Sequence, residues 1–186
     1  LLVHPKGIEY GRILAGHDRV PLLRDSQGHV LSFPPIINSR EVGEVQVGDS
    51  ELFVEVTGTD LAMVVLTLNI LATNLADRGA TIAQVQINYP GKTSLGRSFV
   101  TPVDLGKARS IPLQIIETAL GERLSVQEIG DVLMAYGYHV TKAAQKLAVR
   151  LPPYRNDVLH DVDIVEDVAI SRGYNSFTPV MPSQFT

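Results

Sequence analysis

The amino-acid sequence predicts an α+β protein whose two parts meet near residues 90–108. Strand-like and helix-like patterns alternate before this break, whereas closely spaced helix-capping signals dominate after it. Turn-forming residues run through the break itself, with Pro90, Gly91, Pro102 and Gly106 spaced along it. A chain of 186 residues is long enough for one large domain or two small ones.

The first part is predicted to contain short strands around one long helix. A polar turn divides residues 22–33 into two short strands. Residues 52–57 and 82–89 are rich in β-branched and aromatic side chains, so each is predicted to form a strand. Residues 60–76 have the length and composition of a helix, and Gly79 follows as a typical stop. Because apolar residues cover most of this helix, we expect it to be buried on more than one side.

The second part is predicted to contain three helices. The first lies within residues 110–121, with Pro112 near its first helical position. Ser125–Glu128 has the pattern of a capping box, which begins a second helix that runs to about Tyr136. The third spans about residues 161–171.

The segment between the last two predicted helices fits two structures. Residues 141–147 have good helix propensity and imitate the second helix of a helix-turn-helix. The alternative is a pair of strands, Tyr138–Val140 and Leu147–Leu151, joined by a polar turn. Propensity alone does not decide between them.

The composition excludes several classes of protein. No cysteine is present, which excludes disulfides and thiolate metal sites and fits a reducing cytoplasmic location. A net charge of −4 argues against a protein that coats nucleic acid. The most apolar stretch, residues 61–75, is too short and too polar to span a bilayer. The chain begins without Met or a targeting signal, so we interpret its start as a boundary within a longer protein or a trimmed end.

Five carboxylates lie within residues 157–167, interleaved with Val and Ile rather than Lys. Asp163, Glu166 and Asp167 share one face of the predicted helix, and Asp157 precedes it on an extended arm. Such close like charges repel unless a cation or a basic partner neutralises them. Oxygen ligands of this kind suit Mg²⁺. On spacing alone, the simpler alternative is favoured, in which acidic residues stabilise the first turn of a helix.

Two polar motifs are candidates for binding. In residues 32–39, two prolines fix the backbone ahead of an Asn and a Ser that can donate and accept hydrogen bonds. Residues 56–60 join a predicted strand to a helix N-terminus, where polar or anionic ligands bind. The alternative in both motifs is a local turn or a helix cap. The candidate side chains are Asn38, Ser39, Thr57, Thr59 and Asp60.

Taken together, these motifs resemble one family. Residues 32–39 and 53–60 resemble the editing domain of phenylalanyl-tRNA synthetase beta subunits of the archaeal and eukaryotic type. Residues 152–160, 163–170 and 173–175 resemble the small domain that follows it in the family. The motifs occur in family order along nearly the whole chain.

The resemblance implies an editing domain at residues 1–106 and a small winged-helix-like domain at residues 107–186. The ambiguous segment then forms the two strands of the wing, and no DNA binding is expected. The resemblance also implies a Mg²⁺ ion shared with the alpha subunit. Its carboxylate positions in this sequence are Asp157, Asp163, Glu166 and Asp167.

The function implied is that of one part of a phenylalanine–tRNA ligase. The expected partners are the alpha subunit, in a heterotetramer, the tRNA for phenylalanine, and tyrosine or phenylalanine. ATP is used by the whole enzyme and is not expected to bind this segment. The editing domain is expected to hydrolyse mischarged Tyr-tRNA, because an apolar pocket rejects an added hydroxyl only weakly. The five polar candidates would form its pocket, with no catalytic base assigned. The alternatives are a stand-alone deacylase of mischarged tRNA and a non-enzymatic module that binds nucleic acid or a partner.

Overall fold

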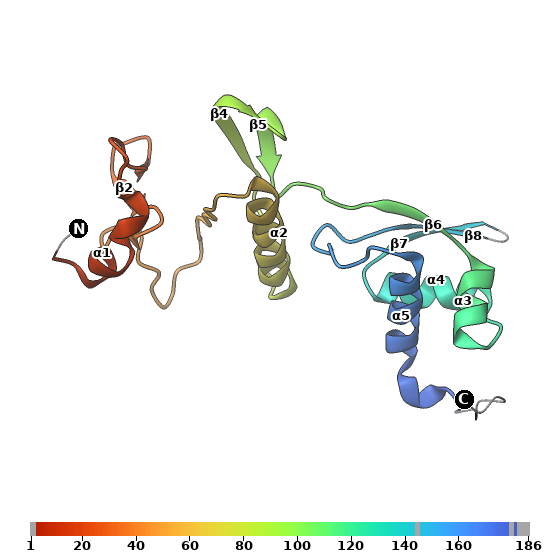
Figure 1. Ribbon diagram of the computed structural model, residues 1–186. Coiled ribbons are helices and arrows are strands. Elements are labelled where there is room, and N and C mark those ends of the chain that lie inside the picture. Colours follow the sequence, from red (N-terminus) through yellow and green to blue (C-terminus); the bar gives the residue numbers. More distant parts are fainter. Residues whose placement is uncertain (1–2, 144–145, 179–180, 182–186) are drawn as a thin grey trace. The chain divides into compact units, whose positions relative to one another are not determined.

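The computed structural model describes residues 3–143, 146–178 and 181 (Figure 1). It is an α+β protein, as predicted, and the chain divides into two compact units, Leu1–Val64 and Val65–Thr186. We call these the N-terminal and C-terminal units. Their boundary falls inside a helix, whereas the predicted domain boundary at residue 106 lies in a later connection. That boundary stays a prediction.

The N-terminal unit holds a short helix and a small antiparallel sheet. Helix α1 (Pro5–Tyr10) continues into a 3-10 helix (Gly11–Leu14). The strands are β1 (Leu23–Arg24), β2 (Val30–Phe33) and β3 (Ile37–Asn38), in the order β1-β2-β3. The first two confirm the strands predicted within residues 22–33.

The strand predicted at residues 52–57 is not formed. This segment has no regular structure, and the Phe53 side chain is 64% exposed. Strand-forming side chains fit a pleated surface, but a strand also needs a neighbour to accept its backbone hydrogen bonds. The prediction of a strand was wrong, because the local sequence does not show whether such a neighbour exists.

Helix α2 (Leu61–Asp77) confirms the predicted long helix. It ends where expected, since the amide of Gly79 donates to the carbonyl of Ala76 at 2.9 Å. Its burial differs from the expectation, because only Val65, Leu66 and Asn69 are buried. The apolar residues Met63, Ile70 and Leu71 are exposed, so burial on more than one side is not observed.

A β-hairpin follows α2. Strand β4 (Val85–Thr93) pairs with β5 (Gly96–Thr101), and the rings of Tyr89 and Phe99 stack with centroids 5.8 Å apart. The predicted strand at residues 82–89 therefore begins later and runs further. Pro90 and Gly91, which we took for the start of a break between domains, lie inside β4. The length of β4 was underestimated because its pairing partner β5 comes from residues without a strong strand pattern.

The rest of the C-terminal unit is a three-stranded antiparallel sheet with three helices on one face (Figure 1). The strands are β6 (Ala108–Pro112), β7 (His139–Ala143) and β8 (Lys146–Arg150), in the order β6-β8-β7. The helices are α3 (Leu113–Leu120), α4 (Val126–Ala135) and α5 (Asp161–Arg172), and a 3-10 helix (Tyr174–Ser176) follows. Helices α3 and α4 together with the β7–β8 hairpin form the winged-helix-like arrangement that was expected.

Local sequence signals explain most of these boundaries. Ser125 Oγ accepts a hydrogen bond from the amide of Glu128, and the Glu128 carboxylate accepts one from the amide of Ser125, so the predicted capping box is confirmed. Helix α3 ends at Gly121, whose φ of 72° lies in the left-handed region that favours glycine. Ser110 was expected to open α3, but it lies in β6 and Pro112 precedes the first turn. The strand pair replaces the alternative helix at residues 141–147; residues 144 and 145 lie outside the described residues.

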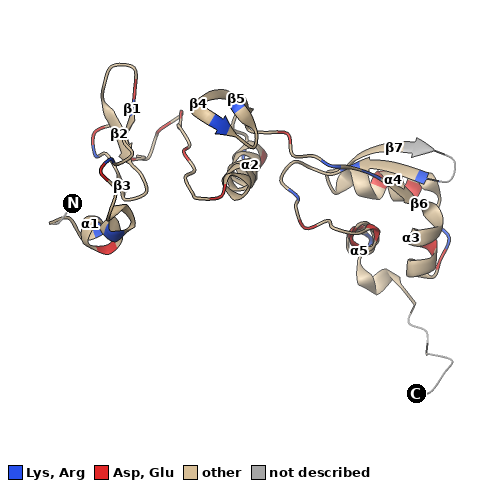
Figure 2. Ribbon diagram, turned by 45° about the horizontal axis from the view of Figure 1, so that its top comes forward, with Lys and Arg blue, Asp and Glu red and all other residues tan. Residues whose placement is uncertain are grey.

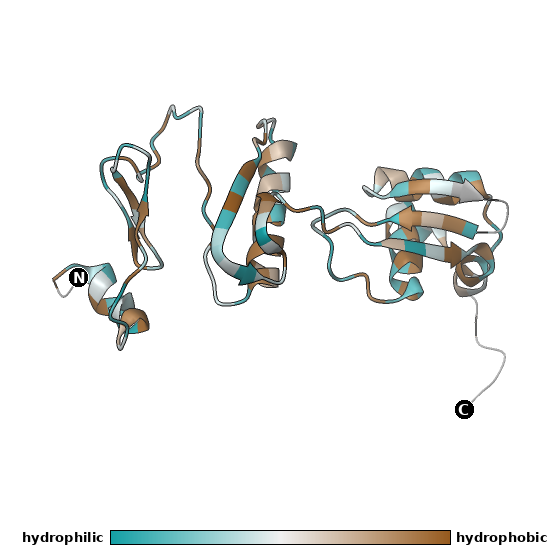
Figure 3. Ribbon diagram, turned by 90° about the horizontal axis from the view of Figure 1, so that it is seen from above, coloured by the Kyte–Doolittle hydropathy of each residue, from teal (hydrophilic) through white to brown (hydrophobic). Residues whose placement is uncertain are grey.

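The core of the chain lies between this sheet and its helices (Figure 3). Its fully buried side chains come from strands and helices alike. Burying a side chain of this size stabilises the fold by about 1.5–3 kcal/mol. Each strand and helix therefore gains stability by packing its apolar face against the other elements. No helix in the described parts of the chain has the length and apolar character needed to cross a membrane. The fully buried side chains include Ile111, Ile116, Ile129, Leu133, Leu147 and Ile164.

Candidate functional site

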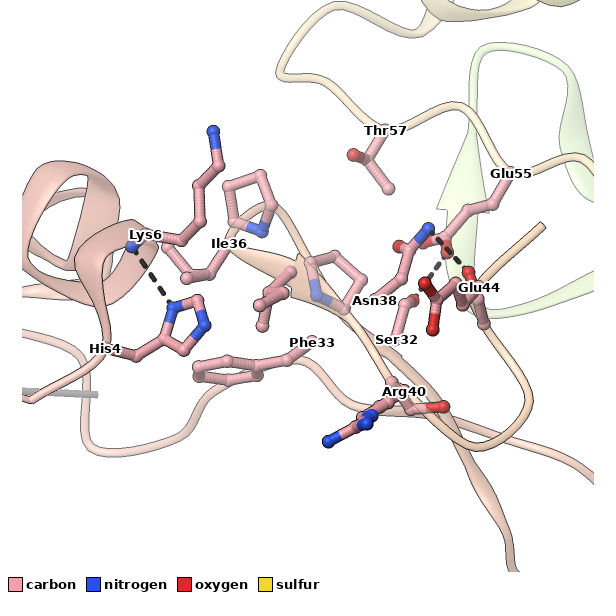
Figure 4. Close-up of a pocket in the computed structure, with 15 residues that line it drawn as sticks. His4, Lys6, Ser32, Phe33, Ile36, Asn38, Arg40, Glu44, Glu55 and Thr57 are labelled. Atoms are coloured by element: carbon pink, nitrogen blue, oxygen red, sulfur yellow. Dashed lines mark hydrogen bonds between the residues drawn. The ribbon is translucent and has the colours of Figure 1, made fainter. Parts of the chain in front are cut away.

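A cavity of about 690 Å³ opens in the N-terminal unit, between α1, the β2–β3 turn and the segment after residue 50 (Figure 4). Its lining combines apolar side chains with hydroxyl, amide and charged groups. An apolar cavity with a few converging polar groups is the usual form of a small-molecule site. The lining residues that matter below are His4, Lys6, Ser32, Phe33, Ile36, Asn38, Ser39, Arg40, Glu44, Glu55 and Thr57.

A hydroxyl–carboxylate pair joins two walls of this cavity. The buried Ser32 donates from Oγ to Oε2 of Glu55 at 2.7 Å (Figure 4). This bond fastens the irregular segment that carries Glu55 to strand β2. Neither residue is among the candidate side chains predicted from the sequence, although Ser32 begins the motif at residues 32–39. Glu55 is two residues before Thr57, and alternate residues of an extended chain face the same side, which is the signal that could have found it.

Asn38 and Ser39, both predicted, line the cavity while holding the loop beside it. Asn38 donates from Nδ2 to the carbonyl of Gly43 at 3.2 Å, and Ser39 Oγ accepts from the amide of Val42 at 3.2 Å. A Cβ on Gly43 would lie 2.5 Å from the backbone oxygen of Leu31. A side chain at Gly43 would therefore force the loop away from the cavity.

The other three predicted residues differ in whether they line the cavity. Thr57 lines the cavity, whereas Thr59 and Asp60 are not among the lining residues of this cavity. Asp60 accepts from the amide of Met63 at 3.1 Å, which is the helix-cap role weighed as its alternative. The structure thus brings together Asn38, Ser39 and Thr57, and adds Ser32 and Glu55.

The charge of the cavity is mixed. Lys6 and Arg40 lie on its rim with the carboxylates Glu44 and Glu55. His4 caps α1, because its Nδ1 accepts from the amide of Lys6 at 3.2 Å. The lining therefore offers both donor and acceptor groups to a ligand.

A second cluster comprises the four predicted metal ligands, Asp157, Asp163, Glu166 and Asp167, which we call the acidic cluster. It lies along α5 and the segment before it (Figure 2). Asp163 accepts from the amides of Leu159 and His160 at 2.6 and 2.7 Å. These bonds lower the pKa of Asp163. Asp163 thus caps the N-terminus of α5.

Asp167 is only 4% exposed and is surrounded by protein groups. Tyr138 donates its phenol hydrogen to Asp167 Oδ2, and Arg155 Nη2 lies 3.2 Å from the same oxygen. Burial and this hydrogen bond raise the pKa of Tyr138, which therefore stays neutral. The buried charge of Asp167 is balanced by Arg155, as a buried carboxylate requires.

Asp157 is held by the same guanidinium. Arg155 donates from Nε to Asp157 Oδ1 at 2.6 Å and from Nη2 to Oδ2 at 2.7 Å. This two-point contact lowers the pKa of Asp157. The basic partner that the acidic spacing called for is therefore present in the chain itself.

The acidic cluster does not have the geometry of a metal centre. Within residues 3–143, 146–178 and 181, no three His, Asp or Glu side chains are grouped so as to hold an ion. Asp157, Asp163 and Asp167 instead accept hydrogen bonds from protein groups. The residues present do not fit Mg²⁺ in this arrangement.

Comparison with known proteins decides the family. The model of the tRNA synthetase B5 domain matches residues 110–174, which hold helices α3, α4 and α5 and all of the three-stranded sheet except the start of β6. The phenylalanine–tRNA ligase beta subunit of Treponema pallidum subsp. pallidum is 41% identical over 186 residues. That of Borrelia hermsii is 38% identical over 184 residues.

The chain belongs to the phenylalanine–tRNA ligase beta-subunit family. The resemblance inferred from the motifs is thereby confirmed. The alignments cover 100% and 98% of the chain but 31% and 33% of these two beta subunits, so the chain spans about one third of the length of the curated relatives it matches.

A solved beta-subunit structure has the same fold. It is the crystal structure of an N-terminal fragment of the phenylalanyl-tRNA synthetase beta subunit from Pyrococcus horikoshii, which is 34% identical with a TM-score of 0.77. The match covers 93% of this chain and 48% of that one. The beta-subunit fold therefore extends across both the cavity and the acidic cluster.

Proposed function

We propose that this segment supplies a hydrolytic editing site for mischarged Tyr-tRNA to a phenylalanine–tRNA ligase. The observation that carries the proposal is the Ser32–Glu55 pair at the edge of a largely apolar cavity. Phenylalanine has no group for this pair, whereas the phenol of tyrosine can donate to the carboxylate. A site built to hydrogen-bond a hydroxyl discriminates strongly against the analogue that lacks it.

The ring of tyrosine would pack against Phe33 and Ile36 while its amino group and ester lie near Asn38, Ser39 and Thr57. Water attacks the ester carbonyl, the bond between that carbon and the ribose oxygen breaks, and the leaving oxygen takes up a proton. No general base is assigned among the lining residues. Positioning of water by hydroxyl and amide groups and by the tRNA itself would supply the rate enhancement.

The test is deacylation of preformed Tyr-tRNA and Phe-tRNA by the chain. We expect Tyr-tRNA to be hydrolysed preferentially. Glu55→Gln should reduce that preference about 10- to 100-fold, since a hydrogen bond to a charged group contributes about 1.5–3 kcal/mol. Glu51→Gln is the matched control, because it changes an exposed carboxylate of the same segment that does not line the cavity.

Equal hydrolysis of the two substrates, or a preference that Glu55→Gln leaves intact, would contradict the editing proposal. Titration calorimetry adds a second measurement, in which tyrosine should bind more tightly than phenylalanine. The relatives are about three times as long as this chain, which favours a segment of a ligase over a stand-alone deacylase. The net charge of −4 does not favour a module that coats nucleic acid.

We also propose that α5 supports assembly with the alpha subunit of the ligase. Its exposed face carries Val162 and Ile170, eight residues apart on one side of the helix, and Leu159 and Tyr174 extend it at both ends. Exposed apolar groups of this size mark interaction sites when they lie together. In the heterotetramer, Val162→Asp should weaken association, whereas Met134→Asp, at an exposed position of α4, should not.

The shared Mg²⁺ ion is proposed for the assembled ligase only. The four carboxylates would supply oxygen ligands, and the ion would link the subunits electrostatically. As the acidic cluster stands in this chain, Asp157 and Asp167 both pair with the single guanidinium of Arg155. Binding of Mg²⁺ by the chain alone should therefore be weak. Tight binding by the chain alone would contradict this view.

A further inference from the structure

The turn Ser39–Gly43, beside the cavity, carries an arginine that the editing proposal does not use. The amide of Ser39 donates to the carbonyl of Leu31 in β2 at 2.8 Å, and the amide of Gly43 donates to the carbonyl of Ser39 at 3.1 Å. Arg40 follows Ser39 in this turn, and it is exposed and lines the cavity. The backbone of Arg40 is therefore fixed beside the cavity while its side chain stays open to solvent.

A second cation, Lys6, lines the same cavity from α1. Its Nζ lies over the ring of Tyr10, 5.1 Å from the centroid. Among the ion pairs that the described residues form, none includes Lys6 or Arg40. Figure 4 shows both cationic ends apart from the bond between Ser32 and Glu55. The cavity therefore presents two positive charges without an ion-pair partner in this part of the chain.

We propose that Arg40 and Lys6 bind the 5′ phosphate of the tRNA nucleotide whose ribose is esterified to tyrosine. The inference rests on the proposed editing function, and it names the contact that recognises the nucleotide rather than the amino acid. Arginine binds a phosphate through its planar fork of donors, whereas lysine binds it as a compact charge. Neither residue takes part in the hydrolysis itself.

A tyrosyl nucleotide carries charges of both signs, which suits the mixed lining of the cavity. Its ammonium group is positive and its phosphate is negative, and the lining holds the carboxylate of Glu44 as well as the two cations. The cavity volume of about 690 Å³ lies in the range of sites for drug-sized molecules, roughly 300–1,000 Å³. An amino acid and the nucleoside attached to it therefore fit in the cavity together.

The acidic character of the whole chain restricts this contact to the cavity. The net charge is −4, so the chain as a whole does not attract a polyanion. Salt screens exposed charges beyond about 10 Å at 0.1 M ionic strength. Arg40 and Lys6 therefore act on a phosphate that the bound tyrosyl nucleoside has already brought to the cavity.

The experiment measures the binding of two non-hydrolysable analogues to the full 186-residue chain by titration calorimetry. Both contain 3′-amino-3′-deoxyadenosine joined to tyrosine through an amide, and only one carries a 5′ phosphate. The phosphorylated analogue should bind about fivefold more tightly, as expected for an exposed ion pair. Arg40→Gln should remove most of this ratio, and Lys6→Gln should remove part of it.

Arg24→Gln is the matched control, because Arg24 is an exposed cation of β1 that is not among the lining residues of this cavity. It should leave the ratio unchanged. The unaltered chain supplies a test that needs no variant, since the ratio should fall toward one when the ionic strength rises from about 0.05 to 0.5 M. A ratio that does not depend on salt would overturn the inference.

The other outcomes separate phosphate binding from editing. Equal binding of the two analogues by the unaltered chain would overturn the inference and leave the editing proposal standing. So would a ratio that persists when Arg40→Gln and Lys6→Gln are combined, or one that Arg24→Gln lowers equally. If neither analogue binds, both proposals are overturned. The expected ratio without hydrolysis of Tyr-tRNA would support phosphate binding and contradict editing.

Discussion

The cavity region and the sheet–helix region of the C-terminal unit are built in opposite ways. The cavity is formed by short strands, a loop and an irregular segment, and most of its lining side chains are at least partly exposed. The other region interlocks three strands and three helices around side chains with almost no exposed surface. Stability is therefore concentrated in one region and polar chemistry in the other. Functional groups commonly lie on loops that a rigid scaffold positions.

The largest effect expected from this comparison is on stability. Leu147→Ala removes a fully buried side chain of β8 and should reduce the free energy of unfolding by about 2–5 kcal/mol. Phe53→Ala, at an exposed position of the cavity region, should change it by less than about 0.5 kcal/mol. Chemical denaturation measures both. Similar losses from the two substitutions would mean that the regions are not organised differently.

The next effect concerns the buried phenol of Tyr138. Tyr138→Phe leaves Asp167 with one partner fewer and should cost about 1.5–3 kcal/mol at neutral pH. The pKa of Tyr138 is raised in the folded chain, so its contribution is complete below about pH 10, the pKa of an unfolded tyrosine. It is lost progressively as the pH rises above that value.

Thermal unfolding between about pH 8 and pH 11 tests this dependence. Tyr138→Phe should remove part of the alkaline loss of stability, whereas Tyr174→Phe, at an exposed tyrosine of the same unit, should leave it unchanged. Equal alkaline profiles for all three proteins would show that the bond between Tyr138 and Asp167 does not carry the effect.

Substitution of Gly43 is expected to affect stability no more than that of Tyr138, but it should also weaken the binding of tyrosine. Gly43→Ala places a methyl group against backbone oxygens and should cost about 1–3 kcal/mol locally. Because the loop held by Asn38 and Ser39 must then move, tyrosine binding should weaken as well. Gly91→Ala is the control, since a Cβ there meets open space. Calorimetric titration with tyrosine distinguishes them.

The smallest effect is at a helix cap. Ser125→Ala removes the side chain that accepts from the first turn of α4 and should cost about 1 kcal/mol. Ser125→Asn should retain most of that stability, because asparagine also caps helices. Neither change should alter hydrolysis of Tyr-tRNA, since α4 belongs to the scaffold. A loss of hydrolysis in folded Ser125→Ala would show that the two regions are coupled.

The sequence by itself determined the parts of the chain whose signals are local. The capping box at Ser125, the stop at Gly121 and the long helix α2 all follow from residues within a few positions of one another. The polar motifs also led to Asn38, Ser39 and Thr57, which line one cavity. These features were predictable because turns, caps and helical periodicity depend on neighbouring residues.

Tertiary structure alone decided the features that depend on distant residues. Residues 52–57 have a strand-like composition but form no strand, and β6 was missed because its partner β8 lies about 40 residues away in sequence. The pairing of Glu55 with Ser32 joins residues 23 positions apart. Arg155 and Tyr138 contact Asp167 from 12 and 29 positions away in the sequence, so the spacing of the carboxylates did not identify these partners. Only folding brings such partners within hydrogen-bond distance.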